Sequence, residues 1–370
     1  MNIFKEAVKK TINIIDPHLA EKIQDDRVFK SLKRRPPELI WKAVERSSMN
    51  RMDAGGLQLG HLLYVFGGYE TINDTLSVVD VLDLQTGKWV NRFKMPAQMA
   101  QTHVGMCCDG KRFMYAISGQ YGNQCHPATD ECFVLDTQTQ QWESIPKLPE
   151  ARYAAATAYW NGRIHVMGGS RPDRNTPATD HWSLGVKDGK PVENRWRKEI
   201  SIPRGGPHRA SVVVDNKLYV FGGQEGDWIA LPDDPNYIGI GTLTTEVVYP
   251  DTYMLEAGAR QWNRMADMPV QSSHTESSYA VIGKYVIFVA GMKDKNAKTH
   301  VVTLTDVVQA YDTSTNSWRI IGHTPYRIKS TVVGYDNGWL YMTTGQRDRG
   351  PDNPAPGRYY DRTWKARINL

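Results

Sequence analysis

Three histidines in separate parts of the chain carry the side chain best suited to proton transfer near neutral pH. His103, His208 and His274 each stand just before an apolar, strand-like run. An imidazole, with an ordinary pKa of about 6.5, serves as general acid, general base or metal ligand. No local H-x-x-x-H spacing accompanies them, and the basic neighbours Arg209 and Arg327 would repel a cation. We therefore expect proton transfer without metal or other cofactor, assisted by Tyr153 or Tyr121.

Polar residues recur at two kinds of position. One is just before each strand-like run of the kind that follows the histidines, and the other is just after the glycine that ends the following apolar run. Arginine offers paired donors to a carboxylate or phosphate, so the set favours a small polar or anionic ligand. For any single residue, the simpler interpretation is that charges at loop bases cap strands and pair with one another. The residues expected to bind a substrate are Arg209, Arg347, Gln120, Gln224, Gln346, Arg152, Arg327, Lys329, Glu225 and Trp228.

An apolar run ending in glycine must position these side chains, because it recurs along nearly the whole chain. The copies are LLYVFGG (62–68), FMYAISG (113–119), IHVMGG (164–169), KLYVFGG (217–223), YVIFVAG (285–291) and LYMTTG (340–345). Successive final glycines stand 50 to 68 residues apart. One tryptophan recurs with each repeat, at Trp41, Trp89, Trp142, Trp196, Trp262 and Trp318.

Repeats of about fifty residues that carry a recurring glycine and a recurring tryptophan are typical of propellers in which each repeat is one four-stranded blade. Residues 39 to 370 resemble kelch-repeat proteins of the galactose oxidase/kelch superfamily, most closely the plant members. The resemblance implies an all-β, six-bladed kelch β-propeller. We predict tight hairpins at Asn161-Gly162, Asp215-Asn216 and Asn337-Gly338. Residues 39–44 are predicted to close the ring by completing the last blade.

Residues 1–38 lie outside the repeats and are predicted to form a short helical extension. Ile3, Phe4, Ala7, Val8, Ile12 and Ile15 recur at helical spacing. Packing on the propeller flank is favoured over binding to a membrane surface. Plant relatives often carry an N-terminal membrane anchor, and this sequence departs from them there.

Other members of the superfamily carry out reactions whose metal-binding or catalytic residues can be looked for in this sequence. The nitrile-specifier proteins use E-x-x-x-D-x-x-x-H for iron, and here Glu70 and Asp74 match but Val78 takes the third place. Galactose oxidase needs a copper site with a Tyr-Cys crosslink, which the clustered cysteines do not accommodate. Bacterial kelch mutarotases interconvert sugar anomers without a metal, and the likeness to them is one of architecture.

Composition excludes several classes of function. A net charge of +5 without clustered basic tracts argues against nucleic-acid binding. No stretch approaches the roughly 18 to 20 apolar residues that span a bilayer. No signal peptide is seen, so we expect a cytoplasmic protein with reduced thiols, although Cys125 and Cys132 could bracket a loop as a disulfide.

Two functions of different classes remain. The first is a small-molecule site at the propeller axis, with isomerase, epimerase or lyase chemistry by proton transfer. The second is a protein-interaction propeller that binds a partner with one face of the ring. On this long-loop face we expect the loops 120–130, 170–179, 224–248, 292–303 and 346–361, and Trp228 and Tyr237 of segment 224–248 would be anchors. The same segment would also suit a lid over a ligand.

Overall fold

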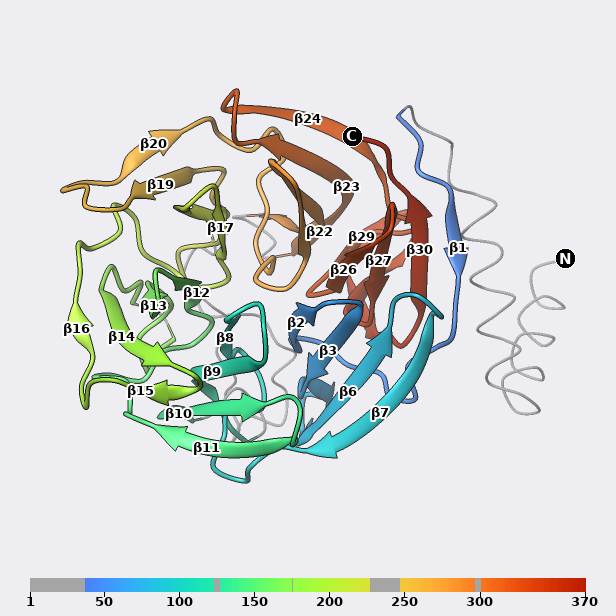
Figure 1. Cartoon of the computed structure of the whole chain (residues 1–370). Helices are drawn as coiled ribbons and strands as arrows, with labels where there is room; N and C mark the ends of the chain where they lie inside the picture. The colour runs from blue at the N-terminus through green and yellow to red at the C-terminus, as the bar shows by residue number, and fades with distance from the viewer. Residues whose placement is uncertain (1–36, 123–126, 175, 227–246, 297–300) are drawn as a thin grey trace, which may run out of the picture.

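The computed structural model describes residues 37–122, 127–174, 176–226, 247–296 and 301–370. Within these ranges every regular element is a β-strand. Six of the antiparallel sheets are arranged as blades around a central axis, which confirms the predicted six-bladed β-propeller (Figure 1). The described residues include no helix long and apolar enough to cross a membrane. The predicted N-terminal helix falls outside the described residues.

Each blade runs outward from the axis through strands that we call a, b, c and d. Blade I contains β2 (Gly55–Leu59), β3 (Leu62–Phe66), β6 (Val78–Asp83) and β7 (Lys88–Lys94). Blade II contains β8 (Gly105–Cys108), β9 (Phe113–Gln120), β10 (Ala128–Asp136) and β11 (Gln141–Ile145). Blade III contains β12 (Ala156–Trp160), β13 (Arg163–Met167), β14 (His181–Lys187) and β16 (Arg197–Lys198), with β15 (Lys190–Pro191) beside β14.

The other three blades repeat this plan. Blade IV contains β17 (Ala210–Val214), β18 (Lys217–Phe221), β19 (Thr252–Glu256) and β20 (Asn263–Met265). Blade V contains β21 (Tyr279–Ile282), β22 (Tyr285–Lys295), β23 (Val302–Asp312) and β24 (Ser317–His323). Blade VI contains β26 (Val332–Asp336), β27 (Trp339–Thr343), β30 (Thr363–Arg367) and, from the other end of the chain, β1 (Trp41–Ala43).

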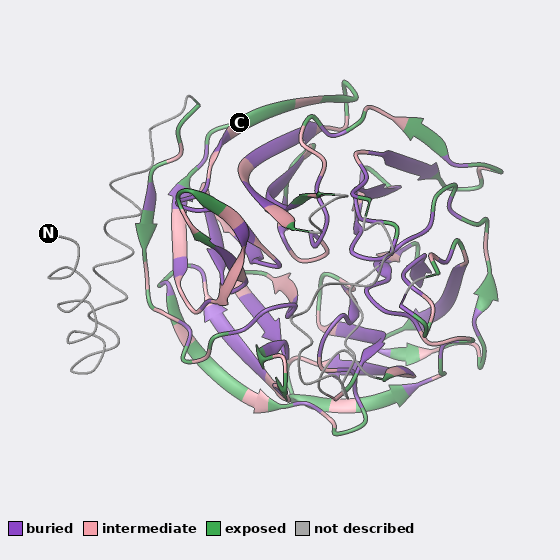
Figure 2. Ribbon diagram, turned by 180° about the vertical axis from the view of Figure 1, so that it is seen from behind, coloured by how far each residue is buried: buried purple, intermediate pink, exposed green. Residues whose placement is uncertain are grey.

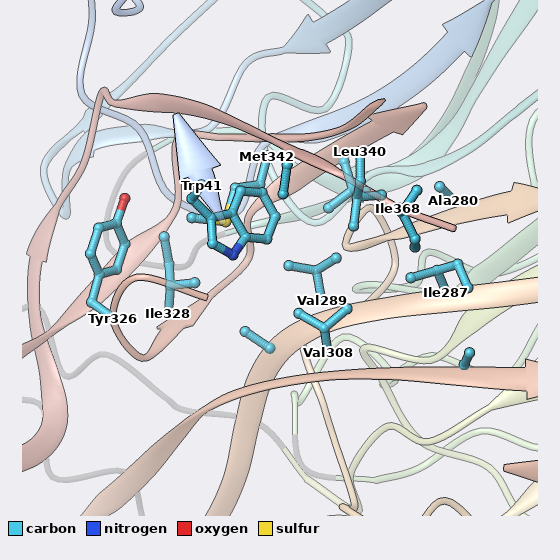
Figure 3. Packing of buried hydrophobic residues seen from close by; sticks show 14 of the residues in the cluster. Trp41, Ala280, Ile287, Val289, Val308, Tyr326, Ile328, Leu340, Met342 and Ile368 are labelled. Atoms are coloured by element: carbon cyan, nitrogen blue, oxygen red, sulfur yellow. The ribbon is translucent and has the colours of Figure 1, made fainter. Parts of the chain in front are cut away.

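The ring is closed by pairing the two ends of the propeller. β1 pairs antiparallel with β30, and Trp41 lies opposite Ala366. The indole of Trp41 packs beside Met342 among residues of blades V and VI (Figure 3). Closure of this kind removes the exposed edge that blade VI would otherwise present.

The recurrent tryptophans join neighbouring blades by the same hydrogen bond. Each indole Nε1 donates to a backbone carbonyl at the outer edge of the preceding blade. The bonds run from Trp89 to Glu45 (3.4 Å), Trp142 to Lys94 (3.2 Å), Trp196 to Pro146 (2.8 Å), Trp262 to Ile200 (3.1 Å), Trp318 to Ala266 (2.9 Å) and Trp41 to His323 (2.7 Å). The tryptophan repeat is therefore a repeat of contacts between blades.

The hydrophobic core is divided into layers between adjacent blades. One cluster combines Leu63 and Val65 of blade I with Val332 of blade VI, and comparable clusters fill the other five boundaries. Outer strands such as β7 and β24 are mostly exposed, whereas the inner strands are buried (Figure 2). This arrangement buries the apolar runs on both faces of each sheet.

The predicted hairpins have the backbone that their residues favour. Asn161, Gly162, Asp215, Asn216, Asn337 and Gly338 all have positive φ between 46° and 82°. Type I′ turns require positive φ at both central positions, which Asn, Asp and Gly adopt most easily.

Two segments expected to be long loops are partly strand. β22 extends to Lys295 and β23 begins at Val302, so much of 292–303 continues the hairpin of blade V. Segment 346–361 contains β28 (Gln346–Gly350) and β29 (Asn353–Tyr359), which form a small sheet with β25 (Ile328–Lys329). A further hairpin, β4 (Tyr69–Thr71) with β5 (Asp74–Thr75), follows the first glycine pair. Backbone pairing satisfies polar groups that a plain loop would leave to solvent.

The last glycine of each repeat is required by the backbone. Gly68, Gly119, Gly169, Gly223, Gly291 and Gly345 have φ between 79° and 123°, and a Cβ at each would lie 2.7 to 2.9 Å from a backbone oxygen. The preceding position also has positive φ but accepts Ser118, Ala290 or Thr344. This difference explains why only the second glycine is present in every repeat.

Replacing Gly169 with alanine tests this requirement. A Cβ there would lie 2.7 Å from the Tyr153 carbonyl oxygen at a φ of 79°. Strain and displaced backbone should lower the free energy of unfolding by about 2 to 4 kcal/mol. The control is Gly162→Ala, which has a φ of 73° and no atom within 4 Å, and should cost about 1 kcal/mol. Equal losses in urea titrations would show that the close contact is unimportant.

Candidate functional site at the propeller axis

One residue at the entry to each inner strand has a left-handed backbone and lies at the axis. These six entry residues are Asp53, His103, Ala154, His208, His274 and Ser330, with φ between 46° and 60°. The chain turns here from the outer strand of one blade to the inner strand of the next. The sixfold recurrence shows that the propeller itself positions these side chains.

The three histidines predicted from the sequence meet at this point. The ring centroids of His208 and His274 are 3.7 Å apart with an interplanar angle of 10°, so the rings stack. His103, from blade II, lies 5.3 Å from His208 of blade IV. All three are buried, with 0 to 5% of each residue exposed. Contact between blades that are not neighbours places the cluster on the axis.

Two carboxylates complete the cluster. His208 Nδ1 lies 2.7 Å from Glu276 Oε1, and His103 Nε2 lies 3.7 Å from Asp53 Oδ2. Ser330 donates a hydrogen bond to the other oxygen of Asp53. The second oxygen of Glu276, Oε2, is buried and accepts no hydrogen bond from the described residues. We call Asp53, His103, His208, His274 and Glu276 the axial cluster.

The charge state of Asp53 follows from its surroundings. Burial alone raises the pKa of this carboxyl, but the positive charges of Lys329, His103 and His208 and the Ser330 hydrogen bond lower it by more. The net pKa of Asp53 is below its ordinary value, so this carboxyl is ionised at neutral pH.

A layer of buried polar and aromatic side chains surrounds the axial cluster. The Tyr153 ring lies 6.5 Å from His103, and the Arg174 guanidinium lies 4.5 Å from the Tyr153 ring. Arg174 Nη1 donates to Gln120 Oε1 over 3.0 Å, and Gln120 also bonds the Tyr69 hydroxyl. Tyr153 and Gln120 therefore lie beside the cluster, and their roles in catalysis and substrate binding stay predictions.

Arg174 is the residue that sequence reasoning missed. It is 1% exposed and reaches inward from the loop after β13. No repeat contains an equivalent residue, so alignment of the repeats carried no signal for it. Asp53 and Glu276 stood at the aligned strand entries but were not among the expected site residues.

Comparison with known proteins supports the fold and decides the family. The chain is 43% identical over 334 residues to a kelch repeat-containing protein of Arabidopsis thaliana, covering 90% of this chain and 77% of that protein. This chain belongs to the kelch-repeat proteins. Residues 55–234 match the model of the KLHDC2/KLHL20/DRC7 Kelch-repeats domain.

More distant kelch relatives share less of their length with this chain. Kelch-like protein terF of Aspergillus terreus is 23% identical over 75% of this chain and 58% of its own, and human Kelch-like protein 23 is 22% identical over 72% and 49%. The solved structure of YjhT superposes with a TM-score of 0.65 at 12% identity, covering 87% of this chain and 96% of YjhT. At that identity the likeness concerns the fold alone.

Many basic side chains near the strand entries pair with carboxylates of the protein. Each blade has an aspartate near the start of strand c that is ion-paired. The pairs are Asp80 with Arg51 and Arg92, Asp130 with Lys147, Asp180 with Arg152 and Arg171, Asp251 with Arg209 and Arg204, Asp306 with His323, and Asp361 with Arg46. These contacts match the simpler interpretation of the basic residues, in which charges at loop bases pair with each other.

Four arginines that were expected to bind a ligand therefore contact carboxylates of the protein. Arg152 and Arg209 belong to the pairs above, and Arg209 is fully buried. Arg327 Nε lies 2.7 Å from Asp348, and Arg347 Nη2 lies 3.6 Å from the same residue. A role for these arginines in ligand binding stays a prediction.

The remaining expected residues are spread over the same face. Gln224 is buried, where it bonds the Ser273 hydroxyl and donates to the Gly226 carbonyl. Gln346 donates to the Gly357 carbonyl within the small sheet of β28 and β29. Lys329 is half-buried, whereas Tyr121 and Glu225 are exposed. Trp228 lies outside the described residues.

Metal ligands and cysteines were also considered in the sequence. Among the described residues, no group of three or more His, Cys, Asp or Glu side chains is arranged to hold a metal ion. Cys107, Cys108 and Cys132 have free thiols, and burial raises the pKa of the Cys132 thiol to about 12. Cys125, the other half of the considered disulfide, lies outside the described residues.

Proposed function

We propose that the axial cluster is a proton-transfer site for a small polar molecule, with isomerisation as its reaction class. The observation that carries this proposal is the pair formed by His208 and Glu276, with His274 stacked on His208. A buried histidine joined to a carboxylate is the arrangement by which proteins orient a general base.

The contacts assign a role to each member of the cluster. A carboxylate only accepts hydrogen bonds, so Glu276 holds the proton on His208 Nδ1 and makes Nε2 the basic nitrogen. His208 would take a proton from the carbon beside a carbonyl of the ligand, while the electron pair of the C–H bond moves to the carbonyl oxygen. Alternatively it would take the proton of an anomeric hydroxyl, so that a carbonyl forms and the ring C–O bond breaks with its electron pair on the ring oxygen. Return of the proton at a different position gives an isomer of unchanged composition. Glu276 and Asp53 would stabilise the positive charge that passes over the histidines.

Access from solvent is supported at Glu276. Its side chain is 19% exposed, whereas those of His208 and Asp53 are 0% and 4% exposed. A ligand approaching this carboxylate would reach the buried histidines next. Because the nearby arginines are paired with aspartates, a polar ligand is better supported than an anionic one.

The test uses a panel of aldoses, ketoses and sugar acids in deuterated water. Proton NMR reports exchange at the carbon beside the carbonyl and the interconversion of anomers. His208→Gln should lower the rate by about 100-fold or more, because a positioned general base contributes 10² to 10⁴. Glu276→Gln should lower it less and shift its pH dependence. His323→Gln is the matched control, since His323 also pairs with a carboxylate, Asp306, but lies on an outer strand.

Two results would end the enzymatic proposal. One is the absence of turnover across the panel while the protein is folded. The other is activity that His208→Gln, Glu276→Gln and His274→Gln all leave intact.

A second candidate is a protein-binding role for the long-loop face, as kelch propellers commonly mediate protein interactions. Exposed apolar side chains stand between strands b and c of three different blades. They are Tyr121 (42% exposed), Val247 (42%) and Val301 (45%). Exposed aromatic and aliphatic side chains are typical of interaction surfaces. Replacing Val247 with aspartate would weaken binding to a protein partner and spare turnover, whereas His208→Gln would do the reverse.

A further inference from the structure

A second feature lies on blade VI, on the face that carries the short turns. Three cationic side chains surround the ring of Trp339. The terminal nitrogen of Lys365 is 4.8 Å from the ring centroid, that of Lys42 is 5.6 Å away, and the Arg367 guanidinium carbon is 5.6 Å away. Lys42 comes from β1, Trp339 from β27, and Lys365 and Arg367 from β30. We call these four residues the blade VI basic cluster.

The two lysines stand directly opposite each other in the sheet. Lys42 pairs with Lys365 in the register of β1 and β30. Like charges facing each other across two strands destabilise a sheet. Within the described residues, the cationic groups bond only neutral atoms, as Arg367 does with the Asn337 carbonyl over 2.9 Å and Lys365 with the Tyr341 hydroxyl over 3.4 Å. The facing lysines therefore carry an electrostatic cost that the described residues do not offset with an ion pair.

Comparison with the other blades shows that this positive charge is not required by the blade plan. The first residue of strand b faces an acidic residue of strand c at Asp83, Asp136, Glu256 and Asp312 in blades I, II, IV and V. Three of these acids form ion pairs, with Arg112, Lys217 and Lys284. In blade VI the same register places Arg367 opposite Trp339. The sign of the charge is reversed at one equivalent position.

Asp336 lies opposite Trp339 in the register of β26 and β27, but within the described residues neither Asp336 nor Asp83 forms an ion pair with Lys42, Lys365 or Arg367. Asp336 accepts a hydrogen bond from the Asn337 side chain over 2.9 Å. Asp83 accepts from the backbone nitrogens of Gln85 and Thr86. Both acids therefore stabilise turns, and the three cationic groups remain directed at the Trp339 ring and the solvent beside it. Lys42 and Arg367 are exposed, and Lys365 and Trp339 are half-buried.

We propose that the blade VI basic cluster binds a phosphate group that carries at least two negative charges. Two lysines supply point charges, and Arg367 supplies planar donors that suit phosphate oxygens. The ring of Trp339 keeps the three cations at fixed distances, because cations are attracted to the faces of aromatic rings. The bound anion would remove the repulsion between Lys42 and Lys365. This site is separate from the axial cluster and does not depend on its proposed function.

The chemistry is shared by a free polyphosphate and by a phosphorylated lipid headgroup, and the experiment separates them. One arm titrates the full chain with pyrophosphate and with inositol hexakisphosphate in a calorimeter. The other measures sedimentation with phosphatidylcholine vesicles, with and without phosphatidylinositol bisphosphate. Binding in solution identifies a free ligand, and binding to the anionic vesicles alone identifies a headgroup. Both outcomes support the proposal.

Matched variants test whether these residues carry the binding. Combined Lys42→Gln, Lys365→Gln and Arg367→Gln should weaken binding by about tenfold or more. The control removes the same charge from exposed lysines near turns of other blades, by Lys88→Gln, Lys111→Gln and Lys187→Gln, and should change binding little. Lys42→Gln alone should also raise the melting temperature, since it removes the repulsion between facing lysines.

The proposal fails on any of three results. The parent protein binds none of the probes, the triple variant binds as tightly as the parent, or the control triple loses as much affinity as the test triple. Because Lys42→Gln is expected to be more stable than the parent, its binding can be measured even if the triple variant does not fold.

Discussion

Replacing Trp41 with alanine is expected to lower the free energy of unfolding by about 3 to 5 kcal/mol. Trp41 is 5% exposed and packs in the layer between blades V and VI. Its indole nitrogen also donates to the His323 carbonyl over 2.7 Å, which ties blade VI to blade V. The substitution removes the largest side chain of β1 and the hydrogen bond that joins these blades. Urea titration followed by tryptophan fluorescence and circular dichroism gives the change in stability.

Ile40 provides the matched control for this substitution. It precedes Trp41 and is 70% exposed, so Ile40→Ala should change stability by less than about 0.5 kcal/mol. A loss of cooperativity in the Trp41→Ala transition would show that blade VI opens before the other blades. Equal stability of the two variants would contradict the role given to β1 in closing the ring.

Acidification is expected to destabilise the protein through a second pair of histidines, His165 and His181. His165 Nδ1 lies 2.9 Å from His181 Nε2, and His181 Nδ1 bonds the Ile200 carbonyl. The pair is buried in blade III, where the tilted ring of Trp160 lies 5.3 Å from His165 and that of Trp262 lies 5.8 Å from His181. Burial lowers the pKa of His165 to about 3, with further lowering from His181 and Arg163. Burial also lowers the pKa of His181 to about 4, partly offset by the Ile200 carbonyl and Glu199.

The direction of the pH effect follows from these values. In the unfolded chain both histidines have the ordinary pKa of about 6.5, so below that pH the unfolded state binds more protons. Stability is therefore complete above about pH 6.5 and falls as the pH drops towards the folded values. The loss is about 1.4 kcal/mol per pH unit for each histidine, or roughly 4 kcal/mol for the pair at pH 5.

Melting temperatures between pH 8 and pH 5 measure this effect. His165→Gln should reduce the dependence of stability on pH, because one of the two titrating groups is gone. His61→Gln is the control, since His61 is exposed and its loss should leave the pH dependence unchanged. A parent protein that is as stable at pH 5 as at pH 7 would contradict the effect of burial on this pair.

Much of the architecture could be predicted because it depends on features that repeat. Six apolar runs, each with a glycine whose Cβ would meet a backbone oxygen, correspond to the six b strands. The Asn-Gly and Asp-Asn pairs adopt the positive φ angles that tight hairpins need. Both signals are local, since they follow from steric limits on one or two residues. Segment 346–361 was predicted to be a loop, and this prediction was wrong, because β28 and β29 pair there in a small sheet that the repeat pattern does not contain.

The candidate site was predictable only in part. Repeat alignment identified His103, His208 and His274 as strand entries, and the propeller brings them together. Alignment also selected Arg152 and Arg209, but it could not show that Asp180 and Asp251 neutralise them. Arg174, in a loop without equivalents, was not found. The aspartates recur with the repeat, but which basic side chain each one contacts depends on distances in space that the repeat pattern does not give.

The sequence by itself determined the number of blades, the hairpins and which residues stand at the strand entries, because repetition and backbone sterics act locally. Only the tertiary structure decided which of those residues meet. Circular closure through Trp41 and Ala366 places the entries of blades II, IV and V around one axis, so that His208 can contact His103, His274 and Glu276. It also placed Lys42 against Lys365, from opposite ends of the propeller. Side-chain charge acts over a few ångströms in space, and those distances exist only once the ring has closed.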